Sequence, residues 1–113
     1  MSIKKFVYKT VISTNDVAIN LIKKKNIKLI LLLSEKQKKG RGQRGKKWIS
    51  YKGNLFVSIF YSLEKMNFTL KQLTSINAKL IIKLISFYCK KKIKLKPPND
   101  ILINKKKICG ILQ

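Results

Sequence analysis

The sequence contains no histidine, and it has only two cysteines and four acidic residues among its 113 positions. Without histidine a His-based catalytic triad is impossible, and the two thiols leave a structural zinc site short of its usual ligands. Cys89 follows a helical pattern and Cys109 lies in an apolar run. We therefore expect both to be buried thiols in a reducing compartment.

The sequence also shows neither a signal peptide nor a membrane-spanning segment. The start MSIKKFVYK becomes polar before an apolar signal-peptide core forms, and the run LILLL is too short to span a bilayer. We expect a cytoplasmic chain with no membrane partner. Its length of 113 residues and its hydrophobic fraction of 45% are those of one globular domain.

Basic residues, in contrast, are abundant: 27 lysines and arginines give a formal charge of +23. Such a charge ordinarily indicates nucleic acid or another anionic partner. Here the indication is weak, because lysine, isoleucine and asparagine are abundant together and all three have A/T-rich codons. Only two of the 27 cations are arginines. Both lie in one loop, and arginine makes the rigid two-pronged contact with phosphate or carboxylate that lysine cannot make.

That loop is KKGRGQRGKKW, residues 38–48, which holds three of the five glycines, six basic residues and the only tryptophan. A solvated lysine-rich turn has no use for glycine at every second or third position. Glycine lets backbone N–H groups approach a ligand closely, while arginine and lysine supply fixed positive charge. The P-loop pattern GxxxxGK[ST] is absent. The sequence therefore predicts a phosphate-holding loop of another kind.

The spacing of apolar residues divides the chain into strands and helices. FVYKTVIS (6–13) alternates as a strand does, and the capping residues STND precede a helical run, VAINLIKKK. KLILLLSEK (28–36) is a continuous apolar run, typical of a strand buried on both faces. A long helix is expected over residues 69–91. Further strands are expected in WISYKGNLFVSIFYSL, after a turn at 52–54, and in KIKLK, ILIN and KKKICGILQ, with PPND as a turn.

Strands interleaved with helices predict an α/β or α+β domain, with a mixed sheet and flanking helices, over residues 1–113. The last segment, ICGILQ, has the pattern of a core strand and ends without a cap. We expect the chain to be the N-terminal portion of a larger domain, with a final strand at the open edge of an unfinished sheet.

Four blocks in order resemble one family, the biotin protein ligases, which use ATP to make biotinyl-adenylate and then biotinylate a lysine of a carboxylase carrier domain. STN (13–15) resembles the family's biotin-contacting turn, and EKQKKGRGQRGKKW (35–48) resembles its adenylate-binding loop. GNLFVSI (53–59) is similar to the strand after that loop, and KPPNDILINKKKICGIL (96–112) is similar to its PND and K-hydrophobic-small-G-I-L block.

The resemblance implies the class II synthetase-like catalytic fold of biotin and lipoate ligases, in incomplete form. It implies ATP, Mg²⁺ and biotin as ligands, and the biotin carboxyl carrier domain of acetyl-CoA carboxylase as partner. Lys107 would contact the biotin carboxylate and the α-phosphate, and Arg41 and Arg44 would hold the loop over the adenylate. Lys107 and Arg41 are the implied catalytic residues, and Asp100 is the implied Mg²⁺ ligand. The implied biotin or adenylate contacts are Ser13, Thr14, Asn15, Gln37, Gly40, Arg41, Gly42, Gln43, Arg44, Trp48, Asn99, Asp100, Lys107 and Gly110.

The sequence departs from the family pattern in several places. Gln43 stands where better-known members carry a second arginine, and Pro97 replaces the tryptophan of the usual KWPND. The family's later strands, its C-terminal β-barrel and the DNA-binding domain of repressor-type members have no counterpart in the sequence. We therefore expect no specific DNA partner, and weak or no ligation by the 113-residue chain alone.

The alternative is a small basic nucleic-acid-binding domain without enzymatic activity, which the charge of +23 motivates. Against it, the aromatic residues form no recognisable reading platform interleaved with basic residues. Those residues are Tyr51, Phe56, Phe60 and Tyr61.

Overall fold

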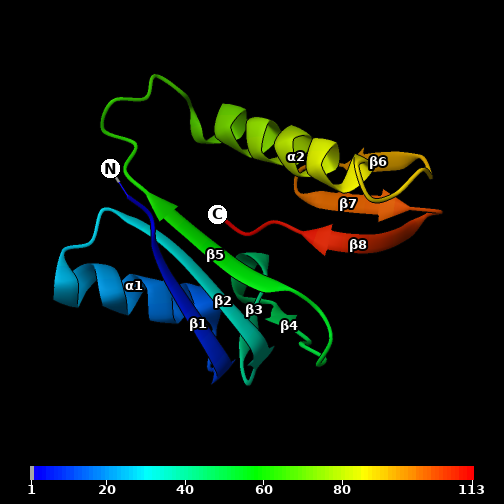
Figure 1. Cartoon of the computed structure of the whole chain (residues 1–113). Helices are drawn as coiled ribbons and strands as arrows, with labels where there is room; N and C mark the ends of the chain where they lie inside the picture. The colour runs from blue at the N-terminus through cyan, green and yellow to red at the C-terminus, as the bar shows by residue number, and fades with distance from the viewer. Residues whose placement is uncertain (1) are drawn as a thin grey trace. The chain divides into compact units, whose positions relative to one another are not determined.

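The computed structural model describes residues 2–113, which form two compact units divided between Lys65 and Met66 (Figure 1). The first unit contains β1 (Lys4–Val11), α1 (Thr14–Lys25), β2 (Leu29–Gln37), β3 (Gly40–Arg41), the short 3-10 helix η1 (Gln43–Gly45), β4 (Lys47–Trp48) and β5 (Phe56–Tyr61). The second contains α2 (Leu70–Ser86), β6 (Ile93–Lys96), β7 (Asp100–Ile103) and β8 (Lys106–Gly110). Strands and helices are interleaved along the chain, as the sequence predicts, although in the second unit a single helix precedes three strands.

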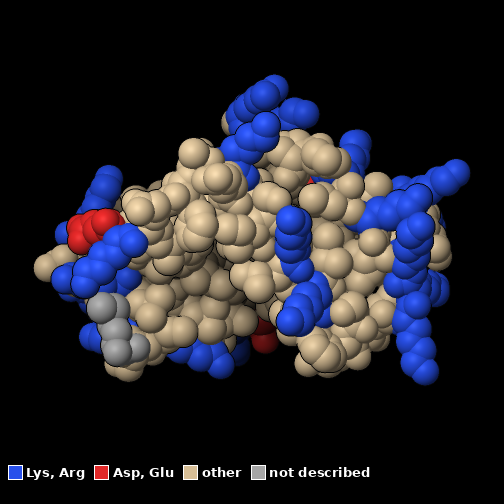
Figure 2. All heavy atoms as spheres, turned by 90° about the horizontal axis from the view of Figure 1, so that it is seen from above, with Lys and Arg blue, Asp and Glu red and all other residues tan. Residues whose placement is uncertain are grey.

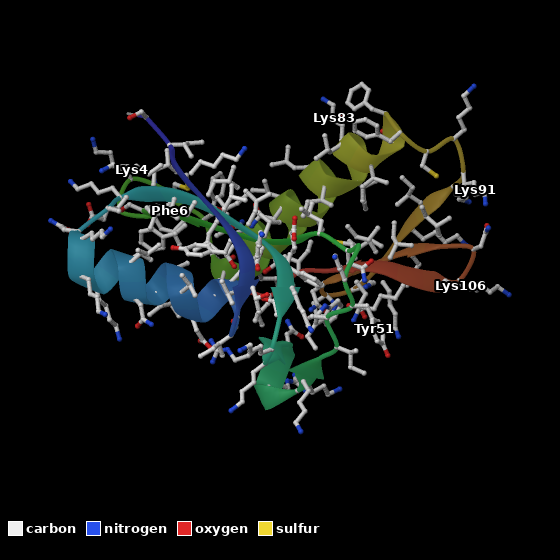
Figure 3. The ribbon with its side chains drawn as sticks, turned by 60° about the horizontal axis from the view of Figure 1, so that its bottom comes forward. Lys4, Phe6, Tyr51, Lys83, Lys91 and Lys106 are labelled. Atoms are coloured by element: carbon white, nitrogen blue, oxygen red, sulfur yellow. The ribbon has the colours of Figure 1, made fainter. Side chains whose placement is uncertain are left out.

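A three-stranded mixed sheet in the order β1-β2-β5 is the centre of the first unit. β1 runs parallel to β2, with α1 as the connection between them, and β5 pairs antiparallel with β2. Helix α1 covers one face of this sheet, where Ala18, Ile30 and Leu32 form the buried core. Phe6, which Figure 3 labels on β1, packs against this cluster.

Burial along β2 differs from the sequence prediction. Ile30 and Leu32 are fully buried, but the alternate residues Leu29, Leu31 and Leu33 are only partly buried. The prediction of a strand buried on both faces is therefore wrong for one face. The physical reason is that α1 covers the face of Ile30, whereas Leu31 and its neighbours lie on the other face.

The ends of α1 follow from its capping residues. The Ser13 side chain accepts a hydrogen bond from the Asp16 backbone N–H, which satisfies one of the free N–H groups of the first turn. Asn26 ends the helix in the left-handed conformation, with φ of 47°, which asparagine tolerates better than most residues. The cap that STND predicts is confirmed.

Helix α2 begins with a capping box, in which Thr69 and Gln72 satisfy one another's backbone N–H groups. The helix ends at Ser86, five residues before the end that the sequence predicts. Phe87 and Tyr88 are 76% and 86% exposed, so the apolar pattern that predicted a longer helix has no core to pack against there. Cys89 consequently lies outside the helix. Both it and Cys109 are free thiols of intermediate exposure, so the prediction of buried thiols is wrong.

The second unit's sheet has the order β6-β7-β8, with both pairs antiparallel. Ile101, on the central strand β7, is fully buried. Strand β8 is an edge strand and ends at Gly110, so ICGILQ is a strand only in its first part. Beyond it, the Ile111 backbone N–H donates to the Asn99 carbonyl, 3.0 Å away. The Asn99 side chain donates in return to the Ile111 carbonyl, and Asn77 donates to the Gln113 side chain. The segment is therefore held by these separate bonds rather than by a continued ladder.

The turn between β7 and β8 offers a test of the fold. Asn104 and Lys105 both have positive φ, 52° and 63°, as the two central residues of a type I′ hairpin turn require. Left-handed backbone costs a lysine roughly 1 kcal/mol more than a glycine. We therefore expect Lys105→Gly to raise the free energy of unfolding by about 0.5 kcal/mol, once the flexibility of glycine in the unfolded chain is subtracted.

Urea titration followed by circular dichroism measures this change. Lys106→Gly is the matched control, because Lys106 lies within β8, where glycine lowers stability. Equal destabilisation by both substitutions would contradict the turn assignment.

Candidate functional site

The turn between β1 and α1 carries three predicted site residues, Ser13, Thr14 and Asn15. Ser13 and Thr14 are 2% and 5% exposed, and Asn15 is partly buried. The Ser58 hydroxyl, on β5, lies 2.8 Å from the Thr14 hydroxyl and also hydrogen-bonds to Asn15 Oδ1. This turn is therefore tied both to α1, through the Ser13 cap, and to the opposite edge strand of the sheet.

The proton count at Ser58 fixes the direction of these bonds. A hydroxyl has one proton to donate, and Asn15 Oδ1 can only accept. Both contacts are satisfied when Ser58 donates to Asn15 and the Thr14 hydroxyl donates to Ser58. The amide of Asn15 is then oriented with its carbonyl oxygen toward β5, and its NH₂ group is the part left to bind elsewhere.

Gln37, at the end of β2, lies against the same turn. Its Oε1 accepts from the Thr14 backbone N–H at 2.8 Å, and its Nε2 donates to the Ser50 hydroxyl at 3.1 Å. The Thr14 N–H belongs to the first turn of α1, where backbone donors lack helical partners. Gln37 thus joins the turn after β1 to the segment that follows the glycine-arginine loop.

The glycine-arginine loop is a small hairpin rather than an irregular loop. Strands β3 and β4 pair antiparallel, with Gly40 opposite Trp48 and Arg41 opposite Lys47. At its tip is η1, where Arg44 has a positive φ of 56°. Arg44 and Gln43 are exposed, whereas Trp48 and Gly42 are partly buried and Gly40 is buried.

Arg41 makes an ion pair with Asp16 in the first turn of α1, with Nη2 3.1 Å from Oδ1. The two side chains are 51% and 39% exposed. An ion pair at this exposure contributes about 0 to 1 kcal/mol. The pair therefore keeps the Arg41 guanidinium beside the first turn of α1. Because the pair is weak, the guanidinium can leave Asp16 and bind another anion at little energetic cost.

The remaining predicted residues lie in the second unit, on β7 and β8 and next to them. Lys107 Nζ is 2.9 Å from Asp100 Oδ1, and Gly110 pairs with Asp100 in the sheet. Asn99 Nδ2 donates to the Ile111 carbonyl at 2.9 Å. The sheet register also places Lys96 opposite Asp100.

One face of this sheet is basic. Side chains alternate between the faces of a strand, and cross-strand partners share a face. Leu102 is two residues after Asp100 on β7 and therefore lies on the same face. Lys94 and Lys107 both pair with Leu102, so they lie on that face too. Lys96 lies on the same face, so three lysines share a face with a single carboxylate. Such a surface suits an anionic ligand.

Cys109 lies opposite Ile101, on the other face. Burial raises the pKa of the Cys109 thiol above its ordinary value; the Asp100 carboxylate adds to the rise, and Lys107 opposes it. The thiol is therefore protonated at neutral pH, and it lacks the thiolate character of a catalytic cysteine.

The overall charge does not locate the site. On the face that Figure 2 shows, lysines and arginines project at several separate places, and acidic side chains are few. No helix within residues 2–113 is both long and apolar enough to cross a membrane. In that same range no three His, Cys, Asp or Glu residues are grouped as metal ligands are. Asp100 is a single carboxylate paired with Lys107, and Mg²⁺ at nucleotide sites is held by one or two carboxylates together with phosphate oxygens. A Mg²⁺ contact at Asp100 therefore stays a prediction, and no chemical step is assigned to a metal.

The predicted residues thus fall into two groups. The turn after β1, Gln37 and the hairpin are joined by hydrogen bonds and an ion pair in the first unit. Asn99, Asp100, Lys107 and Gly110 are neighbours in the second unit. Ser50 and Ser58 were not among the predicted site residues. Ser58 had a signal, since it is a polar residue in the alternating apolar strand FVSIFY, whereas nothing in the sequence distinguishes Ser50.

Comparison with known proteins supports the resemblance to biotin protein ligases that the sequence motifs indicate. Residues 7–113 match the model of the Biotin/lipoate A/B protein ligase family. The chain is 32% identical over 81 residues to Bifunctional ligase/repressor BirA of Escherichia coli (strain K12), which covers 71% of this chain and 25% of that protein.

Solved structures of biotin ligases have the same fold. Biotin protein ligase from Aquifex aeolicus, in complex with biotin and ATP, superposes with a TM-score of 0.82 at 29% identity, covering 96% of this chain and 46% of that one. Biotin Acetyl Coenzyme A Carboxylase Synthetase from Helicobacter pylori, with bound Biotinylated ATP, superposes with a TM-score of 0.79, covering 96% and 53%. At 23% identity the latter similarity shows the fold alone.

The chain spans about a quarter of the curated relative and about half of these two solved chains. The predicted fold class and the resemblance to biotin protein ligases are confirmed, because the family match extends over nearly the whole chain and the fold agrees. This protein belongs to the biotin/lipoate A/B protein ligase family.

Proposed function

We propose that the chain carries the biotin and ATP contacts of a ligase that joins the two into biotinyl-adenylate, for transfer to a lysine of the biotin carboxyl carrier domain of acetyl-CoA carboxylase. Weak or no ligation by the 113 residues alone stays a prediction. One observation carries the proposal. The protein has four acidic residues against 27 basic ones, and its two aspartates pair with Arg41 and Lys107, the two cations predicted to be catalytic. Each cation is thereby held in place by a carboxylate that a ligand can replace.

The chemistry of adenylate formation fits these residues. A biotin carboxylate oxygen attacks the α-phosphorus of ATP, a new O–P bond forms, and the bond to the bridging oxygen breaks to release pyrophosphate. No proton transfer is needed, so neither histidine nor a cysteine thiolate is required. The demand is for positive charge where anions meet. Lys107 supplies it at the carboxylate and α-phosphate, and Arg41 supplies it from the hairpin.

The other predicted residues have binding roles in this proposal. The turn of Ser13, Thr14 and Asn15, together with Gln37, contacts biotin, while the hairpin covers the adenylate through Gly40, Gly42 and Arg44. Asn99 and Asp100 lie near the nucleotide. The Aquifex aeolicus relative, solved with biotin and ATP, supports this choice of ligands. Cytoplasmic location and the absence of a DNA partner stay predictions.

A first test uses the exposed hairpin. Its glycines and like charges give its exposed tip around η1 few apolar contacts, so amide hydrogen exchange should be fast there in the free protein. The Lys38 and Lys39 backbone N–H groups donate to the Val11 and Ile12 carbonyls and should exchange more slowly. We expect biotin plus ATP to slow this exchange about tenfold, because the ligand supplies the missing contacts. Mass spectrometry of deuterated peptides measures the change, with the peptide of α2 as an internal control. Equal exchange in both states would count against the assignment, as would protection by RNA at high salt but not by biotin.

Gln43 gives a second test. It lies exposed at the start of η1, and a charged group there would contact the adenylate phosphate more strongly than an amide does. A hydrogen bond to a charged group contributes roughly 1.5 to 3 kcal/mol, against about 1 for a neutral one. We therefore expect Gln43→Arg to slow the release of the intermediate at least severalfold.

Filter-binding decay of radiolabelled biotinyl-adenylate measures that release. Lys47→Arg, which also puts an arginine in the hairpin but leaves its charge unchanged, is the matched control. An unchanged release rate in Gln43→Arg would mean that position 43 does not face the ligand.

A further inference from the structure

Three hydrogen bonds run without a break from the turn after β1 to the end of the hairpin. The Thr14 backbone N–H donates to Gln37 Oε1 at 2.8 Å, and Gln37 Nε2 donates to Ser50 Oγ at 3.1 Å. Ser50 Oγ in turn donates to the Trp48 carbonyl at 3.1 Å. We call these three bonds the Ser50 relay. All of its members belong to the first unit.

The direction of the relay is fixed at both ends. A backbone N–H can only donate, so it selects the carbonyl oxygen of the Gln37 amide. A backbone carbonyl can only accept, so it takes the one hydroxyl proton of Ser50 and leaves that oxygen to receive the Gln37 NH₂ group. A flipped amide would lose the Thr14 bond and would place its oxygen against a hydroxyl already committed to Trp48. The relay therefore admits one orientation of Gln37.

Gly40 lies directly against the Ser50 relay, with no room for a side chain. A Cβ atom at position 40 would lie 2.5 Å from the Trp48 carbonyl oxygen, 2.7 Å from Ser50 Oγ and 2.9 Å from Gln37 Nε2. These are the atoms of the relay's last two bonds. The backbone of Gly40 thus lies close beside them, and a side chain at position 40 would displace at least one of them.

We propose that Ser50 is a positioning residue of the biotin site, which acts by holding the Gln37 amide in this single orientation. With Oε1 committed to Thr14 and one N–H committed to Ser50, the amide presents its remaining N–H to a ligand. Gln37 therefore offers this fixed N–H to a hydrogen-bond acceptor, such as the oxygen of a cyclic urea. This inference rests on the proposed function, because it assumes that biotin lies against Gln37.

The first arm of the experiment needs no ligand. We expect Ser50→Ala to free the Gln37 side chain, so that its NH₂ resonances in a ¹⁵N-labelled sample lose their hydrogen-bonded shift. The Thr14 amide should exchange about three- to tenfold faster, because a neutral hydrogen bond of about 1 kcal/mol is weakened. Ser50→Thr keeps the hydroxyl and should restore both signals. Ser62→Ala is the matched control, since Ser62 is exposed and lies outside the relay.

The second arm measures biotin and ATP affinities separately by calorimetry. Ser50→Ala should weaken biotin binding about three- to tenfold and leave ATP binding unchanged, with Ser50→Thr close to the parent protein. A general structural defect would weaken both ligands. Unchanged biotin affinity in Ser50→Ala, or unchanged Gln37 resonances, would overturn the proposal.

The two arms separate this inference from the proposed function. A parent protein that does not bind biotin overturns the function and the positioning role together, while the resonance shifts still decide whether the relay exists. Gln37→Glu covers the case in which Ser50→Ala does not fold. A carboxylate keeps the Thr14 bond but cannot donate to Ser50, so it should weaken biotin binding as strongly. Parent-like biotin affinity in Gln37→Glu would overturn the selection of an acceptor.

Discussion

Replacing Lys107 by alanine is expected to lower the rate of adenylate formation by a factor of about 10² to 10³. The lysine supplies fixed positive charge where the biotin carboxylate meets the α-phosphate, and this charge is needed most in the transition state. In the free protein its Nζ is held 2.9 Å from Asp100, so the side chain is already oriented. Biotin-dependent exchange of labelled pyrophosphate into ATP measures adenylate formation without any carrier protein.

Lys106→Ala is the control for this substitution. Lys106 is the preceding residue on β8 and pairs with Ile103, at the end of the strand next to the turn (Figure 3). Its loss changes the net charge of the protein equally, so a general electrostatic effect would appear in both variants. We expect Lys106→Ala to retain most of the exchange activity. A similar loss in both would show that Lys107 is one surface lysine among many.

Replacing Gly40 by alanine is expected to lower the free energy of unfolding by about 1 to 3 kcal/mol, the usual cost of overpacking. The added Cβ would lie 2.5 Å from the backbone oxygen of Trp48, and backbone cannot move aside as the end of a side chain can. The hairpin would have to separate from Ser50 and Gln37. Biotin affinity should therefore fall together with stability.

Gly42→Ala is the matched control, two residues along the same hairpin. A Cβ at that position would meet nothing closer than 3.5 Å, and its φ of −105° is open to any residue. We expect a change of less than about 0.5 kcal/mol. Urea unfolding of both variants measures the difference. A Gly40→Ala variant as stable as Gly42→Ala would contradict the close packing of the hairpin base.

The sequence predicted the elements of this fold well where one local signal decides the structure. The cap at Ser13, the strand of residues 28–36 and the turn at 52–54 each follow from residue types within a few positions of one another. The predictions failed where packing from distant segments decides. The end of α2 and the burial of β2 both depend on whether another element covers an apolar residue.

In the candidate site, too, the residues with a local sequence signal were predicted, and those that depend on distant segments were not. The glycines and arginines of residues 38–48 indicated a ligand loop because their residue types are unusual for a solvated turn. Ser50 could not be found in this way, since its role depends on Gln37, 13 residues earlier, and on Thr14, 23 residues before that. The parallel pairing of β1 with β2 and the β3–β4 hairpin bring these segments together. Likewise, the register of β7 with β8 separates Lys107 from Lys105 and Lys106, the two lysines that precede it.

Titration calorimetry with biotin, in the presence and absence of an ATP analogue that cannot be cleaved between its α- and β-phosphates, is the sharpest test of the proposed function. The proposed function predicts saturable binding of one biotin per chain, tightened by the nucleotide and weakened in both Arg41→Ala and Lys107→Ala. The absence of any biotin binding, with or without the nucleotide, would contradict it.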